Sequence, residues 1–419
     1  MDFEYHYSTE QQKFRKEVAA FLDANLPPAY PKPYFPIDHV HMSLADHKWS
    51  KEFRQKMGEK GWLFPTWPKQ YGGGGLTQEY DVVIQEEVAR RRLPRFMPSE
   101  LMAAAVMVWG SEDQKQSLVK PLLQGQMGTF QLFTEPSSGS DLASLKTKAV
   151  KDGDDWVITG EKVFVGEHSG SKLGPQEEPD VLDEVDEMFT LAITDPQAPR
   201  HRNMGYFIVP ANLPGITFQK LDLLADWGKM QIYLDNVRVP GNRLIGAAGQ
   251  GWQVAQTSLE LEHGGGGQVV SRDYAAEQLL EYARETGKIR DPHLLHAVMD
   301  AHIDSEIGRL IGLRNYWMYE NKQEMSYHGS QNSLWRKESA LRIADNMREV
   351  VGPTALLDRN DPKAPFFGEF EHFQRDSLVR AHPGGTIEVQ RVIMARRLGV
   401  SRTKEKAAAT PNTVASNKK

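Results

Sequence analysis

The spacing of apolar residues changes twice along the chain. In residues 8–130 the apolar side chains recur every three or four positions, as in FRKEVAAFL from residue 14, and this spacing predicts helices. Ser8 and Gln11 form a capping-box pattern at the first of these helices. The stretch GWLFPTWPKQYGGGGL (61–76) interrupts the pattern as an aromatic, glycine-rich loop. Helical spacing then returns through QEYDVVIQEEVARR and SEDQKQSLVKPLL.

The character of the chain changes near Gly128. Short runs rich in β-branched and aromatic residues follow, and Gly, Pro and Asp separate them, which predicts strands. They are TFQLFTEP, DWVITGEKVFV, MFTLAITD, GYFIVP, GITFQKL and MQIYLDNVRVP. From Gly251 to Gly399 helical spacing resumes, with long segments predicted at 251–286, 291–322 and 331–351.

This order of helices, strands and helices predicts an α+β multidomain chain. We expect an N-terminal all-α domain at 1–127, a middle β-domain of the barrel type at 128–240 and a C-terminal helical bundle at 241–402. The tail at 403–419 is rich in Ala, Lys, Thr and Asn and is expected to be disordered.

Composition narrows the class of protein. The 419 residues carry a formal net charge of −6, which argues against nucleic acid as a partner, because no basic excess would neutralise phosphates. The absence of cysteine excludes thiolate metal sites, disulfides and a cysteine nucleophile. No HExxH pattern or Rossmann fingerprint is present. The N-terminus is charged and the longest apolar stretch, Leu101 to Trp109, is about half a membrane span. We therefore expect a cytoplasmic protein without a membrane partner.

The stretch HPGGTIEVQR (382–391) raises a chemical question. A proline stops the chain, two glycines and a threonine follow, and helical spacing begins again. Glycines before a helix let backbone N–H groups approach an anion or a flat ligand closely. The stretch itself offers only Glu388 as an acid or base, so a catalytic group has to lie elsewhere in the chain.

The segment FTEPSSGSDLASLKTKAVKDGDDWVITGEKVF (133–164) resembles the acyl-CoA dehydrogenase family. The loop at 61–76, GSEDQKQSLVKPLLQG, DNVRVPGNRLIGAAGQGW and GGTIEVQRVIMARRLG extend the resemblance over nearly the whole chain, in the family's order. The resemblance implies a helical, β-barrel and helical-bundle chain that binds FAD and a CoA thioester and is usually a tetramer. It also implies removal of hydrogen from Cα and Cβ of the acyl group, with an electron-transfer flavoprotein as acceptor.

By matched position, the resemblance implies two sets of binding residues. Those for FAD are Phe133, Thr134, Gly139, Ser140, Phe164, Gly166, Arg284, Glu349, Gly352, Thr386 and Glu388; those for the substrate are Ser140, Glu260 and His263. Arg284 matches an arginine that usually reaches the FAD of a neighbouring subunit. Taken singly, Thr-Glu-Pro and Gly-Ser-Asp are also common turn and cap residues.

The base departs from the pattern of many family members, which carry a glutamate where this chain has Gly384. The backbone N–H of Gly384 can still polarise a thioester oxygen. A minority of the family has its glutamate on the helix after GW, here GWQVAQTSLELEHGGGG (251–267). On a helical wheel Glu262 falls in the apolar arc and Glu260 on the polar half. We therefore expect Glu262 to be the base, against the alternative of a buried glutamate paired with His263 or an arginine.

Other departures concern space and contacts near the flavin. Four consecutive glycines (264–267) in a helix cost about 1 kcal/mol each, which suggests space for a bulky acyl group or the flavin, or close helix packing. Gly166 stands where the family often has Thr or Ser. The acidic stretch 166–188 is expected to be a solvated loop.

The sequence therefore predicts FAD-dependent α,β-dehydrogenation of an acyl-CoA thioester, with Glu262 as base and hydride passing to flavin N5. A bulky, branched, alicyclic or aromatic acyl group is the expected substrate. Two alternatives stay open: a non-catalytic or FAD-poor subunit of a mixed tetramer, and a flavin oxidase of the same fold. Both a homotetramer and a heterotetramer are compatible with the sequence.

Overall fold

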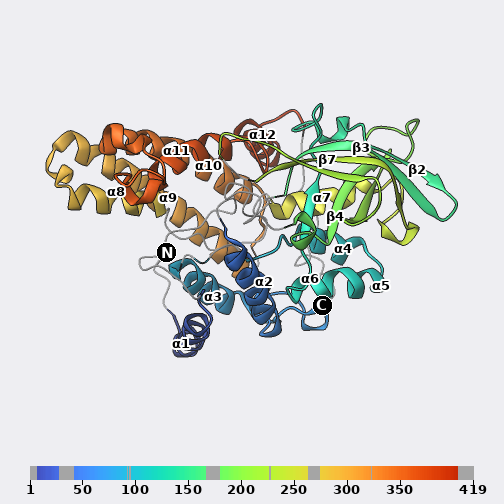
Figure 1. Cartoon of the computed structure of the whole chain (residues 1–419), viewed down its shortest axis with the longest axis horizontal. Helices are drawn as coiled ribbons and strands as arrows, with labels where there is room; N and C mark the ends of the chain where they lie inside the picture. The colour runs from blue at the N-terminus through green and yellow to red at the C-terminus, as the bar shows by residue number, and fades with distance from the viewer. Residues whose placement is uncertain are drawn as a thin grey trace. The chain divides into compact units, whose positions relative to one another are not determined.

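The structure is a computed structural model that describes residues 7–27, 42–91, 93, 96–166, 180–225, 228–262, 274–321 and 323–403. It divides into two compact units, His6–Leu261 and Glu262–Ala407. The first unit holds N-terminal helices and a sheet, and the second holds a helical bundle (Figure 1). The predicted α+β architecture is confirmed. Among the described residues, no helix is both long and apolar enough to cross a membrane.

The first unit begins with the predicted helices. They are α1 (Thr9–Ala24), α2 (Leu44–Glu59), α3 (Gln78–Arg91), α4 (Leu101–Trp109), α5 (Glu112–Gln114) and α6 (Lys120–Leu123), with a π-helical turn at Lys115–Val119 before α6. The capping box at Ser8 is confirmed, because its side chain accepts from the Gln11 N–H and the Gln11 side chain accepts from the Ser8 N–H. The glycine-rich stretch is a loop with one 3-10 turn, Lys69–Tyr71.

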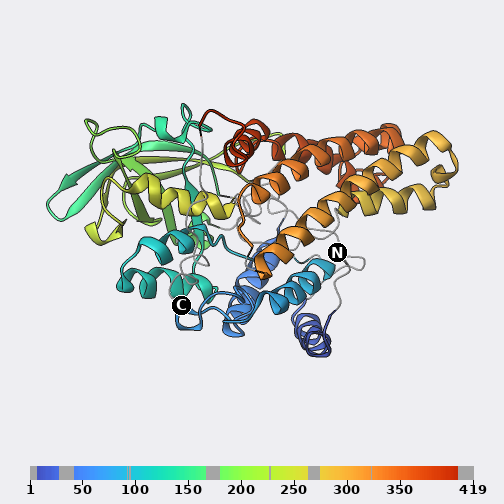
Figure 2. The same ribbon diagram turned by 180° about the vertical axis from the view of Figure 1, so that it is seen from behind.

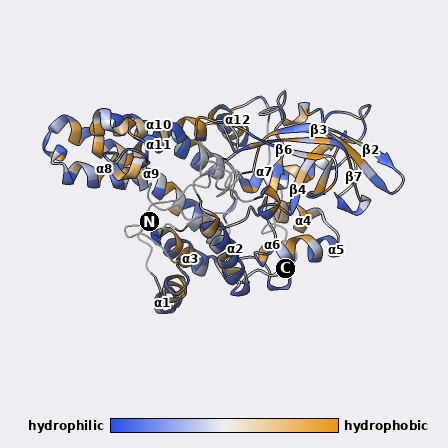
Figure 3. Ribbon diagram, in the orientation of Figure 1, coloured by the Kyte–Doolittle hydropathy of each residue, from blue (hydrophilic) through white to orange (hydrophobic). Residues whose placement is uncertain are grey.

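The predicted β-domain is a sheet in the order β6-β7-β3-β2-β4-β5-β8, with β1 parallel to β4. Its strands are β1 (Thr129–Leu132), β2 (Lys148–Asp152), β3 (Asp155–Val165), β4 (Glu187–Ile193), β5 (Met204–Pro210), β6 (Ile216–Lys220), β7 (Met230–Val239) and β8 (Leu244–Ile245). The sequence pattern missed β2 and β8. The first is polar, as its blue ribbon in Figure 3 shows, and the second is only two residues long.

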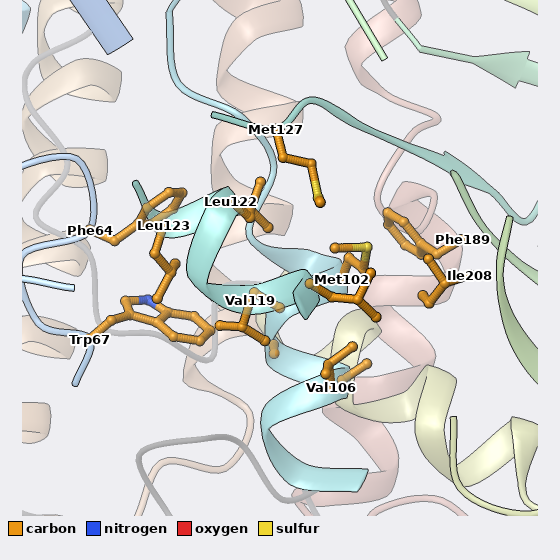
Figure 4. Packing of buried hydrophobic residues seen from close by; sticks show 14 of the residues in the cluster. Phe64, Trp67, Met102, Val106, Val119, Leu122, Leu123, Met127, Phe189 and Ile208 are labelled. Carbon is orange, nitrogen blue, oxygen red and sulfur yellow. The ribbon is translucent and has the colours of Figure 1, made fainter. Parts of the chain in front are cut away.

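Helix α7 (Gly251–Glu262) follows the sheet and packs against β5, where the Ser258 hydroxyl of α7 forms a hydrogen bond of 3.2 Å with the Tyr206 hydroxyl (Figure 2). The helices and the sheet of this unit share a core of aromatic and aliphatic residues. Figure 4 shows part of this core, where Met102 of α4 lies close to Phe189 of β4 and Ile208 of β5. The same core contains Phe133, which directly follows β1, and Val254 of α7.

The second unit is a bundle of α8 (Tyr274–Glu285), α9 (Pro292–Glu320), α10 (His328–Val351), α11 (Glu369–Arg380) and α12 (Ile387–Arg397). Helices α8 to α11 lie side by side around an apolar core that includes Leu279, Val298, Ile343 and Phe370 (Figure 1). The segments predicted at 291–322 and 331–351 are confirmed as α9 and α10. Of the segment predicted at 251–286, residues 263–273 lie outside the described residues.

Candidate active site

The carboxylate of Glu262 lies against the glycine turn that precedes α12. Gly384 and Gly385 have φ values of +62° and +77°, in the left-handed region that favours glycine. A Cβ atom placed on Gly384 would lie 3.5 Å from Oε1 and 3.9 Å from Cγ of Glu262. The space beside this turn, where many family members would place a glutamate side chain, is therefore occupied by the carboxylate of Glu262.

The turn itself is held by α12. The Thr386 hydroxyl accepts a hydrogen bond of 3.2 Å from the Val389 N–H, and Gln390 donates from Nε2 to the Gly384 carbonyl at 2.7 Å. Among the described residues, the Gly384 N–H has no hydrogen-bond acceptor. A donor beside a carboxylate is the arrangement that removal of a proton next to a carbonyl needs, since it polarises the oxygen while the carboxylate takes the proton.

The surroundings of α7 correct the helical-wheel interpretation. Its polar half is buried too: Glu260 is 9% exposed and Thr257 is 1% exposed. The Thr257 hydroxyl accepts from Trp109 Nε1 at 3.0 Å, and Ser258 donates to the Leu101 carbonyl at 2.9 Å. Polar partners on α4 thus compensate the burial of this face. Glu262 is half-buried, so its nearness to Gly384, and not its burial, distinguishes it from Glu260.

Phe164 and Gly166 form a strained end of β3. Phe164 has φ +59° and a side chain that is 55% exposed, next to an irregularity in the pairing of β3 with β7. A bulky residue with positive φ costs about 1–3 kcal/mol and is found mainly at functional sites. Gly166 has φ +65°, and a Cβ there would lie 2.7 Å from the Phe130 ring. A side chain at this position would have to displace the Phe130 ring and would adopt a strained backbone conformation.

The segment after β1 lies beside this end of β3. The Thr134 carbonyl accepts a hydrogen bond of 2.9 Å from the Val163 N–H, so Thr134 and Phe164 belong to one surface. Phe133 is buried and packs edge-on against Phe189 and Tyr206. Its backbone, and not its ring, is thus the part of Phe133 that can face a ligand.

A buried ion pair supports the same segment. Lys162 is 0% exposed and lies 2.8 Å from Oε1 of Glu135; it also donates to the Leu191 carbonyl at 3.1 Å. Glu135 accepts from the backbone N–H groups of Lys146 and Thr147. Burial raises the pKa of Glu135, but Lys162 and these donors outweigh it and hold that pKa below its usual range. The sequence interpretation missed Lys162, although alternation along β3 places it on the inward face with Trp156 and Ile158.

The remaining predicted positions are accessible. Gly139 and Ser140 are exposed, with open space beside Gly139. In the second unit Glu349 is exposed and 2.5 Å from His293, and Gly352 ends α10 with φ +76°. Glu388 is exposed in the first turn of α12, where its own backbone N–H and the Thr386 side chain lower its pKa.

Arg284 is exposed in the last turn of α8 and lines a surface hollow of about 480 Å³ between α8 and α9. The other residues that line it are Glu277, Leu280, Glu281, Glu285 and His302. Three glutamates therefore line the same hollow as the arginine that the family resemblance assigns to FAD. His263 and the glycines 264–267 lie outside the described residues, as does 167–179 of the acidic stretch.

The residues present fit FAD. An exposed aromatic ring held at positive φ, hydrogen-bonding groups of Thr134 beside it and an open glycine loop at Gly139 are features that suit a flat ring and a pyrophosphate. These features belong to the first unit. Glu262 and the Gly384 turn belong to the second.

Comparison with known proteins agrees with these features. The family models of the N-terminal, middle and C-terminal domains of acyl-CoA dehydrogenase match residues 8–126, 131–237 and 249–399. The chain is 25% identical to acyl-CoA dehydrogenase FadE26 of Mycobacterium tuberculosis, covering 93% of this chain and 96% of that protein. It is 28% identical to acyl-CoA dehydrogenase IpdE1 of the same organism, over 84% of this chain and 88% of that protein.

Solved structures give the same result. The structure titled Tcur3481-Tcur3483 steroid ACAD matches with a TM-score of 0.78 and 26% identity, covering 97% of this chain and 100% of that chain. A glutaryl-coenzyme A dehydrogenase shares the fold, with a TM-score of 0.73 and 22% identity over 96% of this chain and 99% of that one. The chain belongs to the acyl-CoA dehydrogenase family, and it is an FAD-dependent oxidoreductase that acts on acyl-CoA.

Proposed function

We propose that this enzyme introduces a Cα–Cβ double bond into an acyl-CoA thioester and that Glu262 removes the Cα proton. One observation carries the proposal: Oε1 of Glu262 lies 3.5 Å from the position that a Cβ atom on Gly384 would take. A carboxylate there stands beside a backbone N–H without an acceptor among the described residues. The Gly384 N–H would bind the thioester oxygen, which makes the Cα proton acidic enough for a carboxylate to accept.

Hydride removal from Cβ requires an acceptor on the face of the acyl chain opposite the base. Bound FAD supplies a two-electron acceptor at flavin N5. The chain's contribution is to orient the ring: the exposed Phe164 side chain is available for its face, and Phe133 and Thr134 offer backbone and hydroxyl groups to its edge. Gly139 and Ser140 are the proposed pyrophosphate contacts, and Thr386 and Glu388 the proposed contacts for the ribityl and adenosine parts.

For the acyl group we propose a bulky, branched, alicyclic or aromatic structure. The support is the relative whose title names a steroid ACAD, at 26% identity over 97% of this chain. An electron-transfer flavoprotein is the proposed electron acceptor.

For the assembly, we propose a tetramer of identical or related chains. An exposed apolar stripe along α9 supports it, because single-chain proteins rarely leave such a row uncovered. The stripe consists of Met299, Ile303, Leu310 and Trp317, which repeat at intervals of four and seven residues.

A specific observation favours a second candidate, a subunit of a mixed tetramer that does not hold its own complete FAD site. Arg284 shares its surface hollow with Glu277, Glu281 and Glu285. Their negative charges oppose the approach of a pyrophosphate to this arginine. In that case a related, non-identical chain of the tetramer would supply the arginine that the FAD site needs.

The first experiment is the visible spectrum of the chain expressed alone, followed by anaerobic mixing with a panel of thioesters. The panel would contain palmitoyl-CoA, isovaleryl-CoA, benzylsuccinyl-CoA and a CoA thioester with a steroid ring system. One FAD per chain and bleaching by a bulky thioester support the proposal. A colourless chain that gains flavin only with a partner chain supports the second candidate. If air reoxidised the reduced flavin at the rate of enzyme turnover, the chain would instead be an oxidase.

A further inference from the structure

Lys337 of α10 connects three parts of the second unit. Its Nζ donates to the carbonyl of Arg380 at 2.9 Å and to the carbonyl of Pro383 at 2.5 Å. The first carbonyl ends α11 and the second immediately precedes Gly384. The ammonium group is also close enough to Glu262 for the two charges to interact. One half-buried lysine thus contacts the glycine turn and faces the proposed base.

Few other charges act on this lysine. Arg336, next to it on α10, opposes its positive charge, whereas Glu262 favours it; burial has the largest effect and lowers the pKa of Lys337 to about 8. Charged side chains on the neighbouring elements are paired. They form the pairs Arg391–Glu338 between α12 and α10, Arg380–Asp376 within α11, and Arg342–Asp304 between α10 and α9. His382 of the turn is exposed and contacts the Leu378 carbonyl, and Glu388 of α12 is exposed.

We propose that Lys337 is a positioning residue for the reaction: its ammonium group holds the turn that carries Gly384 beside the carboxylate of Glu262, and its positive charge keeps that carboxylate ionised. The inference rests on the proposed function. A lysine that only capped α11 would need the Arg380 carbonyl alone. The second bond, to the residue before Gly384, ties the proposed oxyanion donor to the helix that faces the base.

The test measures deprotonation without hydride transfer. Acetoacetyl-CoA has an acidic Cα proton, and its enolate is detected by difference absorbance when it binds to the purified holoenzyme. Titration from pH 5 to pH 9 gives the midpoint at which the base removes this proton. Loss of a nearby positive charge makes a carboxylate harder to ionise. We expect the midpoint of Lys337→Met to rise by about one pH unit, a shift at the low end of those that a close opposite charge produces.

Three further variants separate charge from structure. Lys337→Gln keeps a hydrogen-bond donor without the charge and should show the same rise, even if Lys337→Met folds poorly. Lys337→Arg keeps both charge and donors and should stay within about 0.3 units of the wild type, by the same rule. Lys151→Met is the matched control, since Lys151 belongs to the other unit and also donates to a carbonyl, that of Asp154 at 2.7 Å. It should leave the midpoint unchanged.

The outcomes are distinct. An unchanged midpoint in both Lys337→Met and Lys337→Gln, at normal FAD content, would overturn the proposal for Lys337 while leaving Glu262 as the base. A rise in Lys337→Arg equal to that in Lys337→Met would also overturn it, because charge would then be irrelevant. Absence of enolate formation in the wild type would refute the proposed function itself.

Discussion

The buried pair of Lys162 and Glu135 offers the sharpest prediction about stability. Lys162→Met keeps an unbranched side chain, one heavy atom shorter, but removes the ammonium group. Glu135, whose side chain is 4% exposed, would keep only the backbone N–H donors of Lys146 and Thr147. Removing one partner of a buried pair typically costs 3–5 kcal/mol. Because two donors remain, we expect a loss of about 3 kcal/mol at pH 7.

The stability that Lys162→Met loses should depend on pH, and the pKa of Glu135 determines the direction. In the wild type the pKa of Glu135 lies below its usual range, so its contribution to stability is present above the unfolded pKa of about 4.3 and is lost as pH falls through the folded pKa. In Lys162→Met, burial favours the protonated acid. The deficit of the variant should therefore be larger at pH 8 than at pH 5.5. The double variant Lys162→Met with Glu135→Gln removes both charges and should recover most of the loss.

Hydrogen exchange of the β1 and β3 amides measures this free energy locally, so unfolding of the other unit does not obscure it. Arg200→Met is the control, because the Arg200–Asp141 pair is exposed, at 55% and 61%, and should contribute less than about 1 kcal/mol. A deficit of Lys162→Met below about 1 kcal/mol at pH 7, or one equal at pH 8 and pH 5.5, would refute this reasoning.

Two further substitutions test the supports of the site. Gly166→Ala adds a Cβ at positive φ and 2.7 Å from the Phe130 ring, which should cost about 2–4 kcal/mol of stability and lower the FAD content. Thermal melting with and without added FAD measures both effects. An unchanged melting temperature would be inconsistent with the geometry. Thr257→Val leaves the Trp109 indole N–H without its acceptor and should cost about 1–2 kcal/mol in urea unfolding, whereas no loss would mean that water replaces the hydroxyl.

Periodicity predicted the fold well where one face of an element is apolar. Helix α10 carries such a face, so its apolar residues show the helical period. The strands β4 and β5 are buried along nearly their whole length, and they were recognised as runs of β-branched and aromatic residues between turn residues. β2 was missed because its sequence, KAVKD, is mostly charged and four of its five residues are exposed. Its strand conformation comes from antiparallel pairing with β3, and the local sequence pattern of β2 does not predict that pairing.

The candidate site was only partly visible in the sequence. The family resemblance pointed to Glu262 and Gly384, but their nearness depends on how α7 ends relative to the turn before α12. The helical wheel did not reveal that Glu260 is buried, because polar partners on α4 cover that face of α7. Lys337 carries no local signal at all. Its two carbonyl acceptors lie more than forty residues away in the chain, at 380 and 383.

The most direct test of the account compares two isosteric changes on α7, Glu262→Gln and Glu260→Gln. Each variant would be mixed anaerobically with the thioester that reduces the wild-type flavin fastest, and bleaching would be followed by stopped flow. We predict that Glu262→Gln keeps its FAD but is reduced about 10³-fold more slowly, whereas Glu260→Gln stays within about tenfold of the wild type. Reduction of Glu262→Gln at a near wild-type rate, or loss of reduction only in Glu260→Gln, would contradict the assignment of the base.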